Sequence, residues 1–251
     1  MDLQLKDKTA LVTGASSVGL GRAIAVGLAR EGVHVAITSR REALLQEAAA
    51  EVKAVSGCQP VVIPSDLYDA DSPERLAVAA CAQLGRIDIL INAAGGSRPT
   101  NFEAPAALWE EAMTLNFFRL RALTHAVVSG MIAHHWGRVV NLTGTSEPYN
   151  INAANPSKAA VHAWSKGLSR EVAKSGVTVN CIQPGRITSE QMLRMYPTEE
   201  KRHAFARDVP IGRFGEPDEL AVLAVFLCSP RAGYITGTVI PVDGGLSRFA
   251  F

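Results

Sequence analysis

The stretch LVTGASSVGLGRAIA, from Leu11 to Ala25, decides the fold. A short β-branched run ends at Gly14, and residues at helical spacing begin at Gly21. Glycines at such a connection allow a tight turn and let the backbone approach a bound phosphate closely. A glycine-rich turn alone is also typical of an ordinary strand-to-helix connection, so the rest of the chain has to show whether a nucleotide is expected.

The same alternation of strand and helix continues on the C-terminal side of this stretch. Helical spacing is clear in residues 21–32 and 43–57. Because the strand patterns are continuous apolar runs, both faces of the sheet are expected to be covered, as in parallel sheets. We therefore predict an α/β fold with a doubly wound parallel sheet, a three-layer α/β/α Rossmann architecture of about seven strands. The strand patterns cover residues 9–14, 33–39, 60–66, 87–95, 137–144, 177–185 and 237–245.

The bulk composition fits one dinucleotide-binding domain over residues 1–251 that recognises a small molecule. The 251 residues are 47% hydrophobic and 20% charged, and single α/β domains often reach this length. The 25 basic and 24 acidic residues form no long run of like charge. We therefore expect neither a nucleic-acid partner nor an anionic membrane surface.

Membrane, export and metal signals are weak. The apolar stretch at 221–228 is far below the ~18 residues of a membrane span, and the polar start MDLQLKDK is not typical of a secretory signal. Cys58, Cys81, Cys181 and Cys228 lie far apart and form no CxxC pair. We expect buried free thiols, no metal site and a reducing, cytoplasmic location.

Residues 186–210 are the least regular part of the chain, with Met and Tyr interleaved among charges. Two interpretations stay open for this predicted substrate loop. It forms a pair of surface helices, or it is a mobile lid whose apolar residues close over a substrate.

A series of motifs occurs in the order typical of one enzyme family. They are TGASSVGLG at 13–21, PSDL at 64–67, INAAG at 91–95, MTLNFF at 113–118, NPSKAA at 155–160, QPGRITS at 183–189 and GYITGTVIPVDGG at 233–245. Over essentially its whole length, the chain resembles the short-chain dehydrogenase/reductase family. The resemblance implies a nicotinamide dinucleotide cofactor and hydride transfer. One departure is the turn between Gly14 and Gly19, which is one residue longer than usual.

The resemblance also implies where the cofactor binds. The glycine turn faces the pyrophosphate, Asp66 contacts the adenine, and the turn after Pro184 lies beside the nicotinamide. The cofactor-binding residues implied in this way are Gly14, Ser16, Ser17, Gly19, Leu20, Gly21, Ser39, Arg40, Arg41, Asp66, Leu67, Asn92, Ala93, Gly95, Lys158, Pro184, Gly185, Ile187 and Ser189.

The end of the second predicted strand favours NADP(H) over NAD(H). An acidic side chain at position 39 would accept hydrogen bonds from the ribose 2′-hydroxyl and repel a 2′-phosphate. The chain has Ser39, Arg40 and Arg41 instead, and guanidinium groups suit phosphate oxygens. The alternative is simply a basic start of the next helix, which its dipole disfavours without an anion.

The catalytic motif of the resembled family is incomplete here. Lys158 and Asn116 stand where the family has its lysine and asparagine. Ala154, four residues before Lys158, replaces the expected proton-donating tyrosine, and Gly144 replaces the expected serine. The loop between these two positions is about three residues shorter than is common. Because general acid catalysis typically contributes ~10²- to 10⁴-fold, ordinary carbonyl reduction needs a substitute group.

Several nearby groups are candidate substitutes. Tyr149 lies in the loop before the lysine helix, where it either donates a proton or packs on the loop. Thr143 and Thr145 are candidates for orienting a substrate oxygen. Glu147 is an acid or base only if burial raises its pKa. His162 follows Lys158 by one turn, but we expect it at a helix–helix interface.

Four functions remain open. We rank highest an NADP(H)-dependent oxidoreductase with an atypical active site, acting on a small carbonyl or alcohol. The alternatives are a reductase of conjugated double bonds, a non-redox lyase, hydratase or isomerase, and a catalytically silent NADP(H)-binding protein. Helices over about 108–131 and 156–174 carry more apolar residues than one core-facing stripe needs. Relatives pair these helices, so a homo-oligomer, a tetramer or a dimer, is expected.

Overall fold

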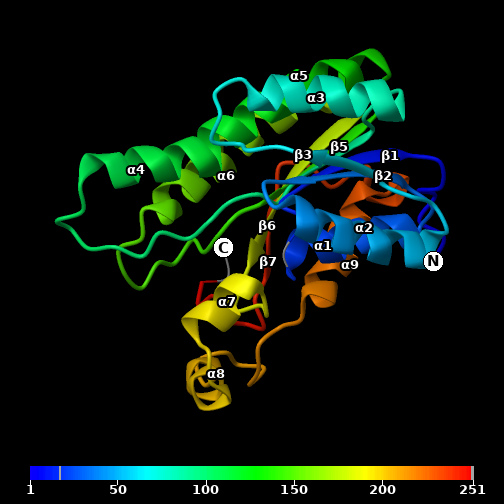
Figure 1. Ribbon diagram of the computed structural model, residues 1–251. Coiled ribbons are helices and arrows are strands. Elements are labelled where there is room, and N and C mark those ends of the chain that lie inside the picture. The colour runs from blue at the N-terminus through cyan, green and yellow to red at the C-terminus, as the bar shows by residue number, and fades with distance from the viewer. Residues whose placement is uncertain (17, 250–251) are drawn as a thin grey trace.

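The computed structural model describes residues 1–16 and 18–249. Within these residues, one parallel sheet of seven strands has the order β3-β2-β1-β4-β5-β6-β7 (Figure 1). The doubly wound fold predicted from the sequence is therefore confirmed. The strands are β1 (Thr9–Thr13), β2 (His34–Ser39), β3 (Val61–Pro64), β4 (Ile89–Asn92), β5 (Gly137–Leu142), β6 (Val177–Pro184) and β7 (Val239–Val242).

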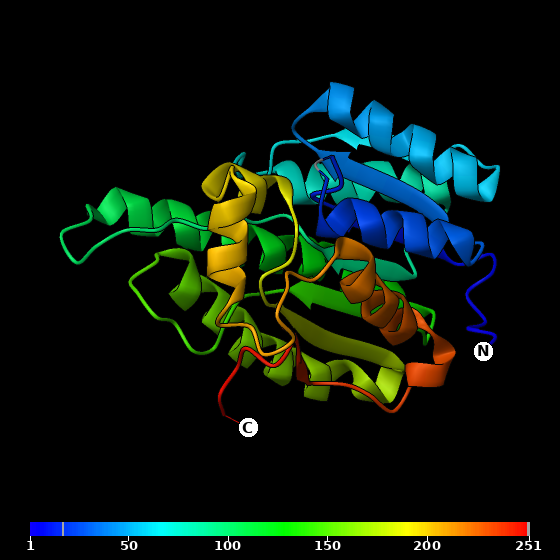
Figure 2. The same cartoon turned by 90° about the horizontal axis from the view of Figure 1, so that it is seen from below.

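Helices cover both faces of the sheet. One layer contains α1 (Leu20–Arg30), α2 (Glu42–Ser56) and α9 (Pro217–Cys228), which Figure 2 shows in blue and orange in front of the sheet. The opposite layer contains α3 (Ser72–Leu84), α5 (Arg119–Ala133) and α6 (Ala154–Val172). A π-helical stretch, Thr114–Phe118, joins α4 (Ala106–Met113) directly to α5, so the helix expected near 108–131 is one continuous run.

Among the described residues, two large apolar cores and one small cluster lie between the layers. Ala10 and Val12 of β1 face α1, α2 and α9, whereas Leu11 between them faces α3 and α5. This alternation follows from the period of two along a strand. Burial on both faces holds for the central strands but not at the sheet edges, because β3 and β7 each have a neighbour on one side only. There the prediction of full burial was wrong.

Segment 186–210 contains a pair of short helices, α7 (Glu190–Met195) and α8 (Glu199–Ala206), which lie apart from the two layers (Figure 1). Ser189 and Thr198 cap them, each accepting a hydrogen bond from a backbone N–H three residues later. This agrees with the helix-pair interpretation.

The four cysteines are free thiols, but the prediction that they are buried was wrong for two of them. Cys58 lies in the turn after α2, and Cys81 lies on the outer side of α3, so both are exposed. Cys181 and Cys228 are buried. Among the described residues, no helix is long and apolar enough to cross a membrane.

Candidate active site

The main cleft of the molecule lies at the carboxyl ends of the strands. It has a volume of about 560 Å³ and is lined by residues that follow β1, β2, β3, β4, β5 and β6. β1 and β4 are neighbours in the sheet, and the strand order runs in opposite directions from this pair. Open α/β sheets bind their ligands at this switch point, because the loops diverge there and leave a crevice.

The glycine turn forms one wall of the main cleft. Gly14 has a φ of +68°, and a Cβ on it would lie 2.8 Å from the backbone nitrogen of Ala94, so a side chain here would be strained and would clash. Thr13 connects the ends of β1 and β4, because its Oγ1 accepts hydrogen bonds from the backbone N–H groups of Ala93 and Ala94, each with a donor–acceptor distance of 3.0 Å. The chain turns closely against β4 before entering α1.

The start of α1 is suited to an anion. Gly19 precedes the helix without a side-chain cap, and the first turn contains no acidic residue. Backbone N–H groups at a helix start have no partner within the helix and lie at the positive end of its dipole. Leu20 and Gly21, which begin α1, line the main cleft. This wall can therefore bind a phosphate group.

Two arginines lie at the far end of the main cleft, but their surroundings differ. Arg40 is exposed, with its Nε 4.0 Å from Asp66 Oδ1 and its guanidinium 5.2 Å from the ring centroid of Tyr68. Arg41 donates from Nη1 and Nη2 to the two carboxylate oxygens of Glu190, over 2.7 and 2.5 Å. This contact raises the pKa of Arg41 and lowers the pKa of Glu190. Ser39 Oγ accepts the backbone N–H of Arg41.

Lys158 lies at the other end of the main cleft, near the start of α6. Its Nζ donates to the backbone oxygen of Thr143 over 3.1 Å. Burial lowers the pKa of Lys158 from 10.5 to about 8, because surrounding protein disfavours the charged form. A Cβ at Gly144 would lie 2.9 Å from Lys158 Cδ. The lysine stem therefore occupies space that a side chain at position 144 would need.

Ala154 is the first residue of α6 and is 2% exposed. Residues four apart share one face of a helix, so its methyl group lies one turn before Lys158 on the same face. The short loop before α6 is fixed to the loop after β4: Arg98 N–H donates to Asn152 Oδ1, and Ala153 N–H donates to the Arg98 backbone oxygen. Asn152 Oδ1 also accepts the Ala154 N–H.

Most side chains that could replace the missing tyrosine and serine are hydrogen-bonded to other groups or lie outside the main cleft. The Thr143 hydroxyl donates to the Ile182 backbone oxygen and lies 2.7 Å from His162 Nε2. Thr145 Oγ1 accepts the backbone N–H of Glu147. Tyr149 is 63% exposed, with the Arg248 guanidinium 5.6 Å from its ring centroid. Of these groups, only Thr143 lines the main cleft.

Glu147 and His162 have partners that the sequence did not indicate. Both carboxylate oxygens of Glu147 accept backbone N–H groups of Arg248 or Phe249, so this side chain binds the end of the described chain. The expected helix–helix position of His162 was wrong, because the helical turn after Lys158 brings it to Thr143 at the end of β5. Burial, and then the charge of Lys158, lowers the pKa of His162.

Most of the expected cofactor residues line the main cleft. These are Gly14, Ser16, Gly19, Leu20, Gly21, Ser39, Arg40, Arg41, Asp66, Leu67, Ala93, Gly95, Lys158, Pro184 and Ser189. Ser17 lies outside the described residues.

Asn92, Gly185, Ile187 and the candidate catalytic Asn116 do not line the main cleft. Asn92 is buried, and its amide donates to Thr124 Oγ1 and Asn141 Oδ1, so it joins β4 to its neighbours instead. Asn116 Oδ1 accepts the Gly96 N–H.

No local sequence pattern indicated a charged cluster at the main cleft, where Tyr68 and Arg98 are lining residues. Arg98 Nη2 donates to Glu111 Oε1 over 2.7 Å and to the Tyr68 hydroxyl over 2.8 Å. Tyr68 in turn donates to Glu111 over 2.7 Å. These contacts raise the pKa of Arg98 and lower the pKa of Glu111. The three residues are distant in sequence, and no motif links them.

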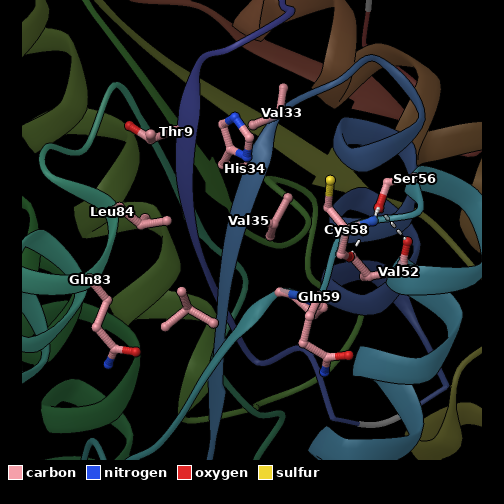
Figure 3. A pocket seen from close by; sticks show the side chains of 12 residues that line it. Thr9, Val33, His34, Val35, Val52, Ser56, Cys58, Gln59, Gln83 and Leu84 are labelled. Atoms are coloured by element: carbon pink, nitrogen blue, oxygen red, sulfur yellow. Dashed lines mark hydrogen bonds between the residues drawn. The ribbon is translucent and has the colours of Figure 1, made fainter.

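A second hollow, of about 260 Å³, lies at the amino ends of the first strands. His34, Cys58 and Gln83 line it together with apolar side chains (Figure 3). Ligand sites in open α/β sheets lie at the carboxyl ends, so this hollow is on the wrong side for the chemistry expected here. Within the described residues, no three His, Cys, Asp or Glu side chains gather as metal ligands.

Comparison with known proteins gives the class of this chain. Residues 14–247 match the family described as Enoyl-(Acyl carrier protein) reductase. The chain is 34% identical over 250 residues to a 3-oxoacyl-(acyl-carrier-protein) reductase of Aquifex aeolicus (strain VF5), covering 98% of this chain and 100% of that protein. The chain belongs to the short-chain dehydrogenase/reductase family, whose matched members are oxidoreductases.

Solved structures agree in fold. L-sorbose reductase from Gluconobacter frateurii, solved with NADPH and L-sorbose, superposes with a TM-score of 0.93 at 31% identity, covering 99% of this chain and 100% of that one. Pseudomonas aeruginosa RhlG, solved as an active-site complex with NADP, superposes with a TM-score of 0.90 at 33% identity, covering 97% and 98%. Both of these similar proteins bind an NADP(H) cofactor.

Proposed function

We propose that this protein is an NADP(H)-dependent oxidoreductase with an atypical active site, transferring hydride to or from a small carbonyl or alcohol substrate. The observation that carries the proposal is the main cleft, which has a basic pair at one end and the enclosed ammonium of Lys158 at the other. The cofactors of the two similar structures support the same choice. We further propose that residues 1–251 act as one domain, with 186–210 as its substrate loop.

The residues of the main cleft fit such a cofactor. The uncapped start of α1 provides backbone donors without a competing acidic side chain, which suits the pyrophosphate. Asp66 and Leu67 would hold the adenine, and Arg40 the 2′-phosphate. Lys158 and Pro184 would flank the nicotinamide riboside. When bound, the nicotinamide supplies or accepts the hydride.

Lys158 is the charged group best placed to act on a reacting oxygen. Neither Ala154 nor Gly144 provides a hydroxyl, and the Thr143 hydroxyl already has two partners. An ammonium in a site that excludes water strongly stabilises negative charge that develops on a substrate oxygen. We propose that Lys158 performs this role in addition to holding the ribose.

Reduction of a conjugated double bond is the second candidate function. It is favoured by the methyl group of Ala154 and by the 63% exposure of Tyr149, because neither position provides a phenol in the cleft. The Tyr68 phenol does line the cleft, but it is hydrogen-bonded to Glu111 and Arg98. Hydride added to the β-carbon places negative charge on the carbonyl oxygen, which needs stabilisation more than immediate protonation. Lys158 can provide that stabilisation, and solvent can protonate the α-carbon afterwards.

The test is turnover of NADPH with ketones, quinones and enones, followed by product identification. We expect consumption of NADPH. An alcohol product supports carbonyl reduction, and a saturated ketone from an enone supports the second candidate. Lys158→Met should lower turnover at least 100-fold, whereas Lys166→Met, an exposed lysine on the same helix, should not. Tight NADPH binding without turnover of any substrate would contradict the enzyme proposal and favour a silent binding protein.

A further inference from the structure

Glu190 and Arg41 form an ion pair across one end of the main cleft. Arg41 precedes α2, whereas Glu190 is the first residue of α7, 149 positions further along the chain. Both Nη atoms of the Arg41 guanidinium donate to the Glu190 carboxylate, at distances of 2.7 and 2.5 Å. Both residues line the main cleft. The donor fork that the sequence assigns to a phosphate is therefore already bound to a carboxylate.

The start of α7 is fixed against the glycine turn, so Glu190 is not a freely moving side chain on a distant loop. Its backbone N–H donates to the Val18 oxygen over 3.0 Å. Ser189 Oγ caps the helix by accepting the Met192 N–H, and Ser189 Cβ lies 3.5 Å from where a Cβ on Gly19 would be. These contacts position the Glu190 carboxylate opposite the start of α2.

Arg40 provides a contrast within the same loop. Among the described residues, the carboxylate within ion-pair distance of Arg40 is that of Asp66, at the 4.0 Å limit between Arg40 Nε and Asp66 Oδ1. Arg40 is thus available to a new anion, whereas Arg41 has to exchange one anion for another. The sequence alone does not distinguish the two adjacent arginines, but in the structure Arg41 is bound to a carboxylate at both Nη atoms and Arg40 is not.

We propose that Glu190 sets the cofactor preference by competing with the 2′-phosphate for Arg41. The inference rests on the proposed NADP(H) function and adds a residue to it. A 2′-phosphate carries more negative charge than a carboxylate and has three acceptor oxygens, so it displaces Glu190 from the guanidinium fork. A 2′-hydroxyl is neutral and leaves the ion pair intact. Glu190 therefore lowers the affinity for NADP(H) and has little effect on NAD(H).

The test compares the dissociation constants of NADPH and NADH, measured by nucleotide fluorescence for the wild type, Glu190→Gln, Arg41→Gln and the double variant. Exposed ion pairs contribute ~0.2–1 kcal/mol, which corresponds to about 1.4- to fivefold in a dissociation constant, so we expect Glu190→Gln to tighten NADPH binding by this factor. NADH binding should change by less than this. Arg41→Gln should weaken NADPH binding, and adding Glu190→Gln to it should have no further effect.

Glu199→Gln is the matched control, because it removes the same charge from the first turn of the neighbouring helix α8, where His203 is its ion-pair partner among the described residues. It should leave both affinities unchanged. The inference is wrong if Glu190→Gln binds NADPH no more tightly, or if it tightens NADPH and NADH equally. A wild-type protein that binds neither nucleotide would refute the proposed function itself, which distinguishes the two failures.

Discussion

Lys158 is the residue whose ionisation should control the reaction. Burial lowers its pKa to about 8, so the ammonium predominates below pH 8 and is lost as the pH rises through that value. If the charged form stabilises the reacting oxygen, kcat/KM for reduction at saturating NADPH should be constant at lower pH and fall above about pH 8. His162 is a titratable group close to Lys158; burial and the Lys158 charge lower its pKa from 6.5, so it is neutral around pH 8.

The pH profile should be measured at constant ionic strength, because salt screens the surface charges around the cleft. The thermal unfolding midpoint at each pH provides the control for stability. A kcat/KM that stays constant up to pH 10, where the ammonium is neutral, would exclude Lys158 charge from the rate-determining chemistry.

Gly144 should affect the reaction rate by leaving room for the Lys158 side chain, and not because it lacks the hydroxyl of the family's serine. A Cβ at this position would lie 2.9 Å from Lys158 Cδ, so Gly144→Ala should push the flexible lysine stem aside. Because misplacement by about 1 Å can cost ~10²-fold in rate, we expect kcat/KM to fall about 10- to 100-fold with little change in unfolding temperature.

Gly167→Ala is the matched control for this substitution. It lies on α6 with no atom within 4 Å of the added Cβ, and it should retain full activity. Unchanged kcat/KM in Gly144→Ala would mean that the position of the lysine stem does not limit the reaction.

At the scale of elements, Thr13 fixes the ends of β1 and β4 that form the main cleft. Its hydroxyl oxygen accepts two backbone N–H groups, those of Ala93 and Ala94. Thr13→Val keeps the shape and leaves these donors without their partner, so we expect a loss of about 1–3 kcal/mol in the free energy of unfolding. Urea denaturation measures this loss.

Thr178→Val is the control for Thr13→Val, because it makes the same substitution at a threonine whose hydroxyl has no hydrogen-bond partner among the described residues. The Thr178 hydroxyl is buried and makes no hydrogen bond to any described residue, so removing it should be neutral or stabilising. Equal losses in both variants would mean that valine packing, rather than the two hydrogen bonds, explains the effect of Thr13→Val.

The strands were predictable because each is a local apolar run, and its neighbours in a parallel sheet follow from the glycine turn and the helical crossovers. Asn92 does not line the main cleft, because a motif gives a side chain no direction and here the amide points to Thr124 and Asn141. Arg41 was identified as a cleft residue, but its partner Glu190 was not. An ion pair between residues 149 positions apart has no signature in local sequence.

The whole molecule assembles its candidate site from both halves of the doubly wound sheet. The glycine turn and the arginines follow β1 and β2, whereas Lys158 and Pro184 come from the segments around β5 and β6. The family motifs in the sequence were enough to predict which segments form each half of this site. The substrate could not be predicted, because neither the short loop before α6 nor the proposed substrate loop at 186–210 matches a local sequence pattern of known chemical class.

We predict that the protein assembles as a homo-oligomer, a tetramer or a dimer, through the helical run of α4 and α5 together with α6. Phe118 in this run is 45% exposed although its ring lies 5.4 Å from that of Phe117, and exposed aromatic side chains are enriched at interfaces.

Analytical ultracentrifugation should give a mass of two or four chains for the wild type. Phe118→Glu should reduce that mass without unfolding the protein, because it places a charge in the interface. Val78→Glu, at an exposed position on α3 outside the proposed interface, should not. A wild-type protein that sediments only as a monomer would refute the assembly, and an unchanged mass in Phe118→Glu would exclude this face.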